Sequence, residues 1–225
     1  MFFVEKRLNI IAGHYGSGKT NLAVNLALDI SKSGKKVAVI DLDIVNPYFR
    51  TADFGALFEQ NGIRLAAPLY AGSNLDIPAL PPEIDSLLSD EKTTVIVDVG
   101  GDDAGAIALG RYASLIQDVG YDMFYVINRY RLGTAELEDS VSLMREIETA
   151  SRLRTTQIIN NSNLGRGTTA EDILESVSFT NEVCRKTGLP LAATAVWEQK
   201  ASEVEVPVQY PVHIFVAKPW EQGPF

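Results

Sequence analysis

The stretch LNIIAGHYGSGKT, residues 8–20, decides the fold of this 225-residue chain. Its apolar first half predicts a buried strand, and residues 19–33 place apolar side chains at helical spacing. The glycines and the Lys-Thr pair match G-x-x-x-x-G-K-[ST], a phosphate-binding loop that stands between a strand and a helix. The motif therefore predicts a site for a nucleoside triphosphate. The alternative is a glycine-rich strand–helix turn that matches the pattern by chance.

The chemistry of the loop gives each of its parts a role. Glycines at 13, 16 and 18 permit backbone conformations closed to other residues and let the main chain approach a ligand closely. Backbone amides of residues 16–20 can then converge on phosphate oxygens at a helix N-terminus. Lys19 is expected to reach the β- and γ-phosphates, and the Thr20 hydroxyl to bind Mg²⁺. The predicted nucleotide-binding residues of the loop are Gly13, His14, Tyr15, Gly16, Ser17, Gly18, Lys19 and Thr20.

Strand and helix patterns alternate along the rest of the chain. Further strands are predicted at 36–40, 63–67, 93–98, 123–128, 155–160, 190–196 and 212–216, and further helices at 49–60, 107–116, 134–152 and 169–187. Because the strands are continuously apolar, we expect an α/β P-loop NTPase fold: a mainly parallel, twisted sheet with helices on both faces. Ligands of such sheets bind at the carboxyl ends of the strands. Neither a linker nor a repeat divides the chain, so residues 1–225 are expected to form one nucleotide-binding domain.

Composition narrows the possible partners. The formal net charge of −9 argues against a broad basic surface for nucleic acid, although a local basic patch stays possible. The lone Cys184 allows no internal disulfide, which together with the lack of a signal-peptide pattern predicts a cytoplasmic protein. Cys184 lies in a helical pattern and is expected to be a buried small side chain rather than a nucleophile. No apolar run is long enough to span a membrane.

Acidic residues follow two of the predicted strands. Asp41 and Asp43 would point to the same face if the chain stays extended, one towards a metal-bound water and the other towards an attacking water. The alternative is a strand end capped by solvated acids. Asp98 closes another apolar strand, as expected of the indirect Mg²⁺ partner in a phosphate-loop protein. It also begins a D-x-x-G pattern, in which the amide of Gly101 can sense the γ-phosphate.

These motifs together resemble the MinD/ParA-type ATPases, the CobQ/CobB/MinD/ParA nucleotide-binding domain. The resemblance rests on residues 13–20, on Asp41-Leu42-Asp43-Ile44-Val45-Asn46-Pro47 and on residues 95–101. It implies seven or eight mostly parallel strands and a Mg²⁺-ATP site with Asp41 near the metal, to which Asp98 is added by its own position. It further implies that Asp43 orients the attacking water and that ATP induces a homodimer with nucleotides at its interface.

The chain departs from this family pattern in the loop itself. His14 stands where the family typically has a lysine that reaches the partner's phosphates, and Tyr15 where glycine is usual. An imidazole is a poor substitute for a permanent charge, so we expect slow hydrolysis. His14 could still hydrogen-bond phosphate, and Tyr15 could cover the loop; both could equally face solvent. Neither a membrane-binding basic C-terminal helix nor a basic DNA-binding surface is recognisable.

The identity of the base and the role of Arg50 are weaker inferences. The guanine-reading N-K-x-D pattern is missing, and the resemblance implies that Asn160 or Asn161 reads adenine. An Asn amide can offer a donor and an acceptor to adenine, although Asn-Asn-Ser-Asn could simply form a turn. Arg50 could supply charge to the transferred phosphoryl group, but a surface arginine is the default. Trp197 could line the base pocket or only pack.

The sequence thus predicts a Mg²⁺-ATP-binding protein whose slow ATP hydrolysis, with Lys19 and Asp43 as catalytic residues, drives a conformational or dimerisation switch. Two alternatives stay open. One is an ATP-dependent small-molecule kinase or ligase with acceptor contacts from the loop 70–82. The other is a non-catalytic, nucleotide-dependent binding or adaptor protein. The protein or small-molecule partner itself is not identifiable from the sequence.

Overall fold

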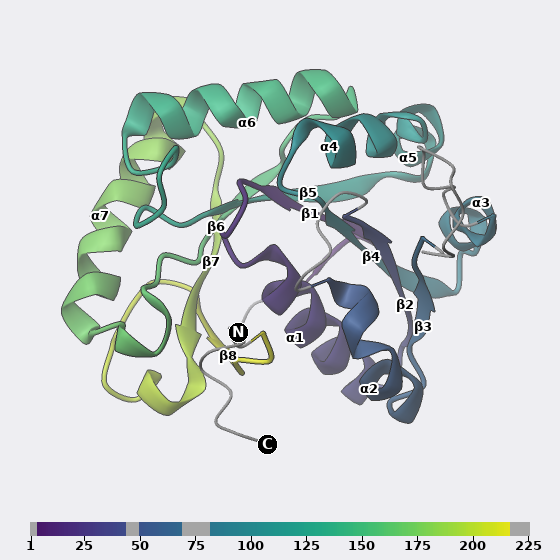
Figure 1. Cartoon of the computed structure of the whole chain (residues 1–225), viewed down its shortest axis with the longest axis horizontal. Helices are drawn as coiled ribbons and strands as arrows, with labels where there is room; N and C mark the ends of the chain where they lie inside the picture. Colours follow the sequence, from purple (N-terminus) through teal and green to yellow (C-terminus); the bar gives the residue numbers. More distant parts are fainter. Residues whose placement is uncertain (1–3, 44–49, 69–81, 217–225) are drawn as a thin grey trace, which may run out of the picture.

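The computed structural model describes residues 4–43, 50–68 and 82–216, which form a three-layer α/β fold around one sheet (Figure 1). The strands are β1 Leu8–Gly13, β2 Lys36–Leu42, β3 Arg64–Ala66, β4 Thr93–Val99, β5 Tyr121–Ile127, β6 Gln157–Asn160, β7 Leu191–Trp197 and β8 Gln209–Val212. They form an eight-stranded sheet in the order β3-β2-β4-β1-β5-β6-β7-β8, and every pairing is parallel. The predicted fold class is confirmed.

Helices cover both faces of the sheet (Figure 1). They are α1 Lys19–Lys32, α2 Gly55–Gln60, α3 Glu83–Ser89, α4 Asp103–Gly110, α5 Ala113–Val119, α6 Leu137–Ser151 and α7 Ala170–Thr187. On one face α1 and α2 pack against alternate strand residues such as Ile11 and Val39. On the other, α3 to α7 cover the residues between them, such as Ile10 and Ile40. Burial on both faces explains why the strands are continuously apolar.

Three expectations about the elements were wrong or incomplete. The helix expected at 107–116 is two helices, α4 and α5. The break follows Gly110, where a Cβ would lie 2.8 Å from the carbonyl oxygen of Ala150 because α4 packs closely on α6. Helix α3 was not predicted, and the segment 49–60 forms a 3₁₀ turn, Thr51–Phe54, before α2. The loop expected at 70–82 lies, except for Pro82, outside the described residues.

The last strand also differs from the prediction, since β8 is Gln209–Val212 and not 212–216. The backbone after it bonds to side chains of α1 rather than to the sheet. The amide of His213 donates to Asn25 Oδ1 at 2.8 Å, and the amide of Phe215 donates to Asn21 Oδ1 at 2.8 Å. Two asparagines one helical turn apart on α1 thus end the strand by taking over its backbone hydrogen bonds.

A buried carboxylate ties α6 to the start of the next segment and gives a test of stability. Glu148 accepts hydrogen bonds from Arg145 at 2.7 Å, from Arg154 at 3.1 Å and from the amide of Thr155 at 2.9 Å. Burial alone would raise the pKa of Glu148, but these hydrogen bonds hold it below the usual 4.5. The carboxylate therefore stabilises the folded state while it is ionised.

We expect Glu148→Ala to lower the free energy of unfolding by about 1–3 kcal/mol, because it leaves the Thr155 amide unpaired. Urea denaturation measures this, with Glu146→Ala on the exposed face of the same helix as the control. The folded-state pKa is the lower one, so the difference is full above pH 4.5 and shrinks as the pH falls through the folded pKa. Equal stability of the two variants at neutral pH would contradict this role.

Among the helices of the described ranges, none combines the length and apolarity needed to cross a membrane.

Candidate functional site

The loop between β1 and α1 has the conformation that its glycines predict. Gly13, Gly16 and Gly18 have φ values of 153°, 73° and 88°, in the region that favours glycine. A Cβ on Gly13 would lie 2.5 Å from the carbonyl oxygen of Val126 in β5, and one on Gly18 would clash with Asn161 Nδ2. The loop therefore packs against the ends of the neighbouring strands too closely for any side chain at these positions.

Lys19 opens α1 beneath this loop and is 7% exposed. Its Nζ donates a hydrogen bond to the carbonyl oxygen of His14 at 3.0 Å, so the side chain folds back along its own loop. Burial lowers the pKa of Lys19, while the negative charges of Asp98 and Asp43 act in the opposite direction. An ammonium in this position is held ready for an anion that enters the loop.

Thr20 and Asp98 meet at the carboxyl ends of the central strands. The Thr20 hydroxyl donates to Asp98 Oδ2 at 2.8 Å, which brings together residues 78 positions apart. Asp98 is 1% exposed, and its Oδ1 has no hydrogen-bond partner among the described residues. Burial and the neighbouring Asp41 raise the pKa of Asp98 to about 8. A buried oxygen without a partner beside a hydroxyl is a donor set that suits a hard cation such as Mg²⁺.

Asp41 lies directly opposite Asp98 in the β2–β4 register. It is fully buried, and its two oxygens accept the amides of Asp43 and Ala52, both at 2.9 Å. Burial raises the pKa of Asp41, and these amides act against the rise. Asp43 is 7% exposed and lies against Gly100, where an added Cβ would be 3.3 Å from its Oδ1. The structure thus brings both predicted acids to the Asp98 side of the loop.

No cluster of three or more His, Cys, Asp or Glu residues with metal-binding geometry occurs within the described ranges. A phosphate-loop site holds Mg²⁺ in another way, through a hydroxyl, the phosphates and waters rather than a protein cage. The residues present here, Thr20 with Asp98 and Asp41 behind it, fit that arrangement.

Gly101 follows β4 and packs directly on the phosphate-binding loop. A Cβ at Gly101 would lie 2.6 Å from Tyr15 Cα and 3.1 Å from Lys19 Nζ. The next residue, Asp102, caps α4 by accepting the Gly105 amide at 3.1 Å. The D-x-x-G segment therefore links the phosphate-binding loop to the start of α4.

The two asparagines at the end of β6 point to different places. Asn160 is 1% exposed, donates to Ser176 Oγ at 2.9 Å and accepts the amide of Ser162 at 3.1 Å. Asn161 donates through Nδ2 to the Ser17 carbonyl at 2.7 Å. Only Asn161 of the pair contacts the loop, while Asn160 holds α7 and the turn after β6. Ser17 is fully buried, and its Oγ lies 3.1 Å from the position that a Cβ on Gly13 would take.

The loop between β5 and α6 also contributes, which the sequence reasoning missed. Arg131 Nε donates to the Gly16 carbonyl at 3.1 Å. Gly133 lies beside His14, since a Cβ added to Gly133 would lie 3.2 Å from His14 Nε2. Burial and the charge of Lys19 lower the pKa of His14, so the ring is neutral near pH 7. The signal was the position of residues 129–134 directly after a predicted strand of a parallel sheet.

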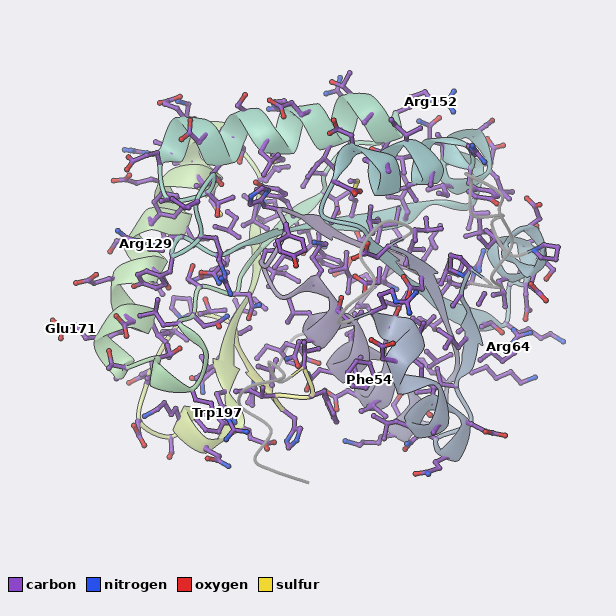
Figure 2. All side chains as sticks on the ribbon, viewed as in Figure 1. Phe54, Arg64, Arg129, Arg152, Glu171 and Trp197 are labelled. Carbon is purple, nitrogen blue, oxygen red and sulfur yellow. The ribbon has the colours of Figure 1, made fainter. Side chains whose placement is uncertain are left out.

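The remaining candidates lie at the edges of this region. Tyr15 is 58% exposed at the mouth of the loop. Trp197 ends β7, as labelled in Figure 2. Arg50 forms an ion pair with Asp53 at 3.7 Å, on the segment that leads into α2.

Solved structures with the same fold include FtsY from Thermotoga maritima, with a TM-score of 0.57 and 18% identity over 82% of this chain and 59% of that one. FtsY from Mycoplasma mycoides has a TM-score of 0.55 and 15% identity, and the match covers 82% of this chain and 58% of that one. The 54 kDa signal recognition particle protein from Aeropyrum pernix K1, in complex with GDP, has a TM-score of 0.54 and 20% identity, and the match covers 86% of this chain and 42% of that one. This chain thus spans less than two thirds of their length, and the likeness shows the fold.

Comparison with curated proteins finds no match. The model of one protein family, the CobQ/CobB/MinD/ParA nucleotide-binding domain, matches residues 8–169, from the first residue of β1 to the cap of α7. The match covers most of the chain and all the residues of the site described above up to Asn161. The chain therefore belongs to the CobQ/CobB/MinD/ParA nucleotide-binding family.

Proposed function

We propose that this protein binds Mg²⁺-ATP at the loop 13–20 and hydrolyses it slowly, and that nucleotide state switches its conformation or its dimerisation. The observation that carries the proposal is that Thr20 donates a hydrogen bond to the buried Asp98, whose charge also acts on the buried Lys19 beneath the loop. A solvated, merely structural turn would not need a buried lysine and a buried aspartate oxygen without a partner.

The residues divide the work as follows. Loop amides bind phosphate oxygens, and Lys19 leaves the His14 carbonyl to contact the β- and γ-phosphates. Thr20, with Asp98 and Asp41 behind it, would hold Mg²⁺, which supplies charge neutralisation when bound. Asp43 orients a water for attack on the γ-phosphorus. As the new P–O bond forms, the bond to the bridging oxygen breaks, leaving ADP, inorganic phosphate and a proton.

The choice of ATP over GTP rests on the missing N-K-x-D pattern and on Asn161. The related fold in Aeropyrum pernix holds GDP, so guanine is the competing outcome. Asn161 contacts the loop, and its carboxamide is the one we propose for adenine reading.

We expect Asn161→Ala to weaken ATP binding by about tenfold, because it removes a base contact and the hydrogen bond to the Ser17 carbonyl. Titration calorimetry with ATP and GTP measures both affinities. Asn163→Ala serves as the control, since its side chain bonds within its own turn. Tighter binding of GTP than of ATP by the wild-type protein would contradict the assignment of the base.

Phosphate release from Mg²⁺-ATP, followed together with light scattering for mass, tests the function as a whole. Slow release accompanied by an ATP-dependent doubling of mass supports the dimerisation switch. Tight ATP binding with neither release nor a mass change would overturn it. The acceptor-dependent kinase or ligase and the non-catalytic adaptor would then take its place.

A further inference from the structure

When a triphosphate is bound, the negative charge at the site would exceed the positive charge that Lys19 supplies. Asp43 and Asp98 lie close enough to Lys19 for their charges to affect its pKa, and a bound triphosphate adds further negative charge. His14 supplies no compensating charge, because burial and the nearby ammonium lower its pKa. Negative charge that collects in a poorly solvated site is stabilised most effectively by a fixed cation at its edge.

Arg131 is held at that edge. Its Nε donates to the Gly16 carbonyl at 3.1 Å, and a Cβ on Gly16 would lie 3.5 Å from its Cζ. In the described part of the chain, no carboxylate forms an ion pair with this guanidinium, so its outer N–H groups remain for a ligand.

The segment that carries Arg131 is built to hold its shape. Asn128 Oδ1 accepts the amides of Tyr130 at 3.1 Å and Asn163 at 3.2 Å. The carbonyl of Asn128 accepts the Thr134 hydroxyl at 2.6 Å and the Arg131 amide at 3.1 Å. A loop fixed at both ends places its side chain over the phosphate-binding loop with little entropy left to lose on binding.

Two other arginines have different partners. Arg129, two residues earlier, donates to the Glu175 carbonyl at 3.3 Å and lies over the ring of Phe179 at 5.5 Å, so its side chain lies beside α7 (Figure 2). Arg50 is paired with Asp53. Arg131 differs from both in donating a hydrogen bond to the backbone of the phosphate-binding loop.

We propose that Arg131 is a second phosphate-binding cation, supplied by the same chain, whose guanidinium contacts the terminal phosphate of the bound nucleoside triphosphate. The inference rests on the proposed function and adds to it a residue that discriminates triphosphate from diphosphate. A guanidinium can donate two parallel hydrogen bonds to one phosphate while Nε keeps its bond to the loop.

The test is the affinity of the wild-type, Arg131→Ala and Arg131→Lys proteins for Mg²⁺-ATP and Mg²⁺-ADP, measured by titration calorimetry. We expect Arg131→Ala to raise the Kd for ATP by about tenfold and that for ADP by less than about twofold, since a charge-assisted hydrogen bond to the terminal phosphate is lost. Arg131→Lys should restore part of the ATP affinity because it keeps the charge. Arg129→Ala, on the same loop, is the control and should change neither value.

The outcomes separate this inference from the function on which it rests. An equal loss of ATP and ADP affinity in Arg131→Ala would show that the residue only supports the loop through Gly16, which overturns the inference. Unchanged affinities would overturn it as well. Neither result contradicts nucleotide binding by the wild-type protein. Failure of the wild-type protein to bind either nucleotide would overturn the proposed function together with the inference.

Discussion

Replacement of Lys19 by alanine is expected to weaken binding of Mg²⁺-ATP by roughly 100-fold or more, because charge-assisted hydrogen bonds to two phosphates are lost together. The change also removes the ammonium that faces Asp43 and Asp98 in a buried site. The negative charge of Asp43 would then repel the incoming phosphates without compensation from the ammonium. Titration calorimetry or a fluorescent nucleotide analogue measures the loss.

A matched control lies on the same helix. Lys32 closes α1 at its other end, pairs with Asp29 at 3.5 Å and is 70% exposed in its side chain. Lys32→Ala should keep the wild-type affinity, since an exposed ion pair one turn from the helix end contributes little. Thermal unfolding of Lys19→Ala checks that the protein is folded. Wild-type ATP affinity in folded Lys19→Ala would refute the site at residues 13–20.

The sequence was informative where the local pattern and the sheet architecture impose the same structure. Strand β1, the loop and α1 were predicted because a buried strand, a glycine turn and an amphipathic helix follow one another within 25 residues. Asp41, Asp98 and Thr20 could be grouped in advance because parallel strands deliver their carboxyl ends to one edge. The contact between Thr20 and Asp98 is the expected consequence.

Tertiary contacts decided what the sequence could not. Asn160 and Asn161 are neighbours with the same chemistry, and strand geometry requires them to diverge, but only packing determines which one meets the loop. Asn161 reaches Ser17, 144 residues away, while Asn160 bonds to Ser176 on α7. The early end of β8 is similar, because it depends on Asn21 and Asn25 of a distant helix. Arg131 was missed since nothing around it in sequence marks it as different from Arg129.

Asp43→Asn is expected to separate binding from turnover. The amide keeps the size of the side chain and removes the charge with which we propose Asp43 orients the attacking water. We expect the rate of phosphate release to fall on the order of 100-fold or more, the usual effect of losing a group that positions or accepts a proton in the reaction. ATP affinity should stay equal or become tighter, because a negative charge near Lys19 and the phosphates is gone.

Asp103→Asn is the control for this change, since Asp103 lies exposed in the first turn of α4, beyond the segment that packs on the loop. It should hydrolyse ATP at the wild-type rate. Single-turnover phosphate release and equilibrium binding, measured on the same preparations, distinguish the two effects. If the ATP affinity of Asp43→Asn fell by the same factor as its rate of phosphate release, Asp43 would be acting on ATP binding, through the metal or the loop. Another group would then have to orient the attacking water. A rate within about twofold of wild type would remove Asp43 from the chemistry altogether.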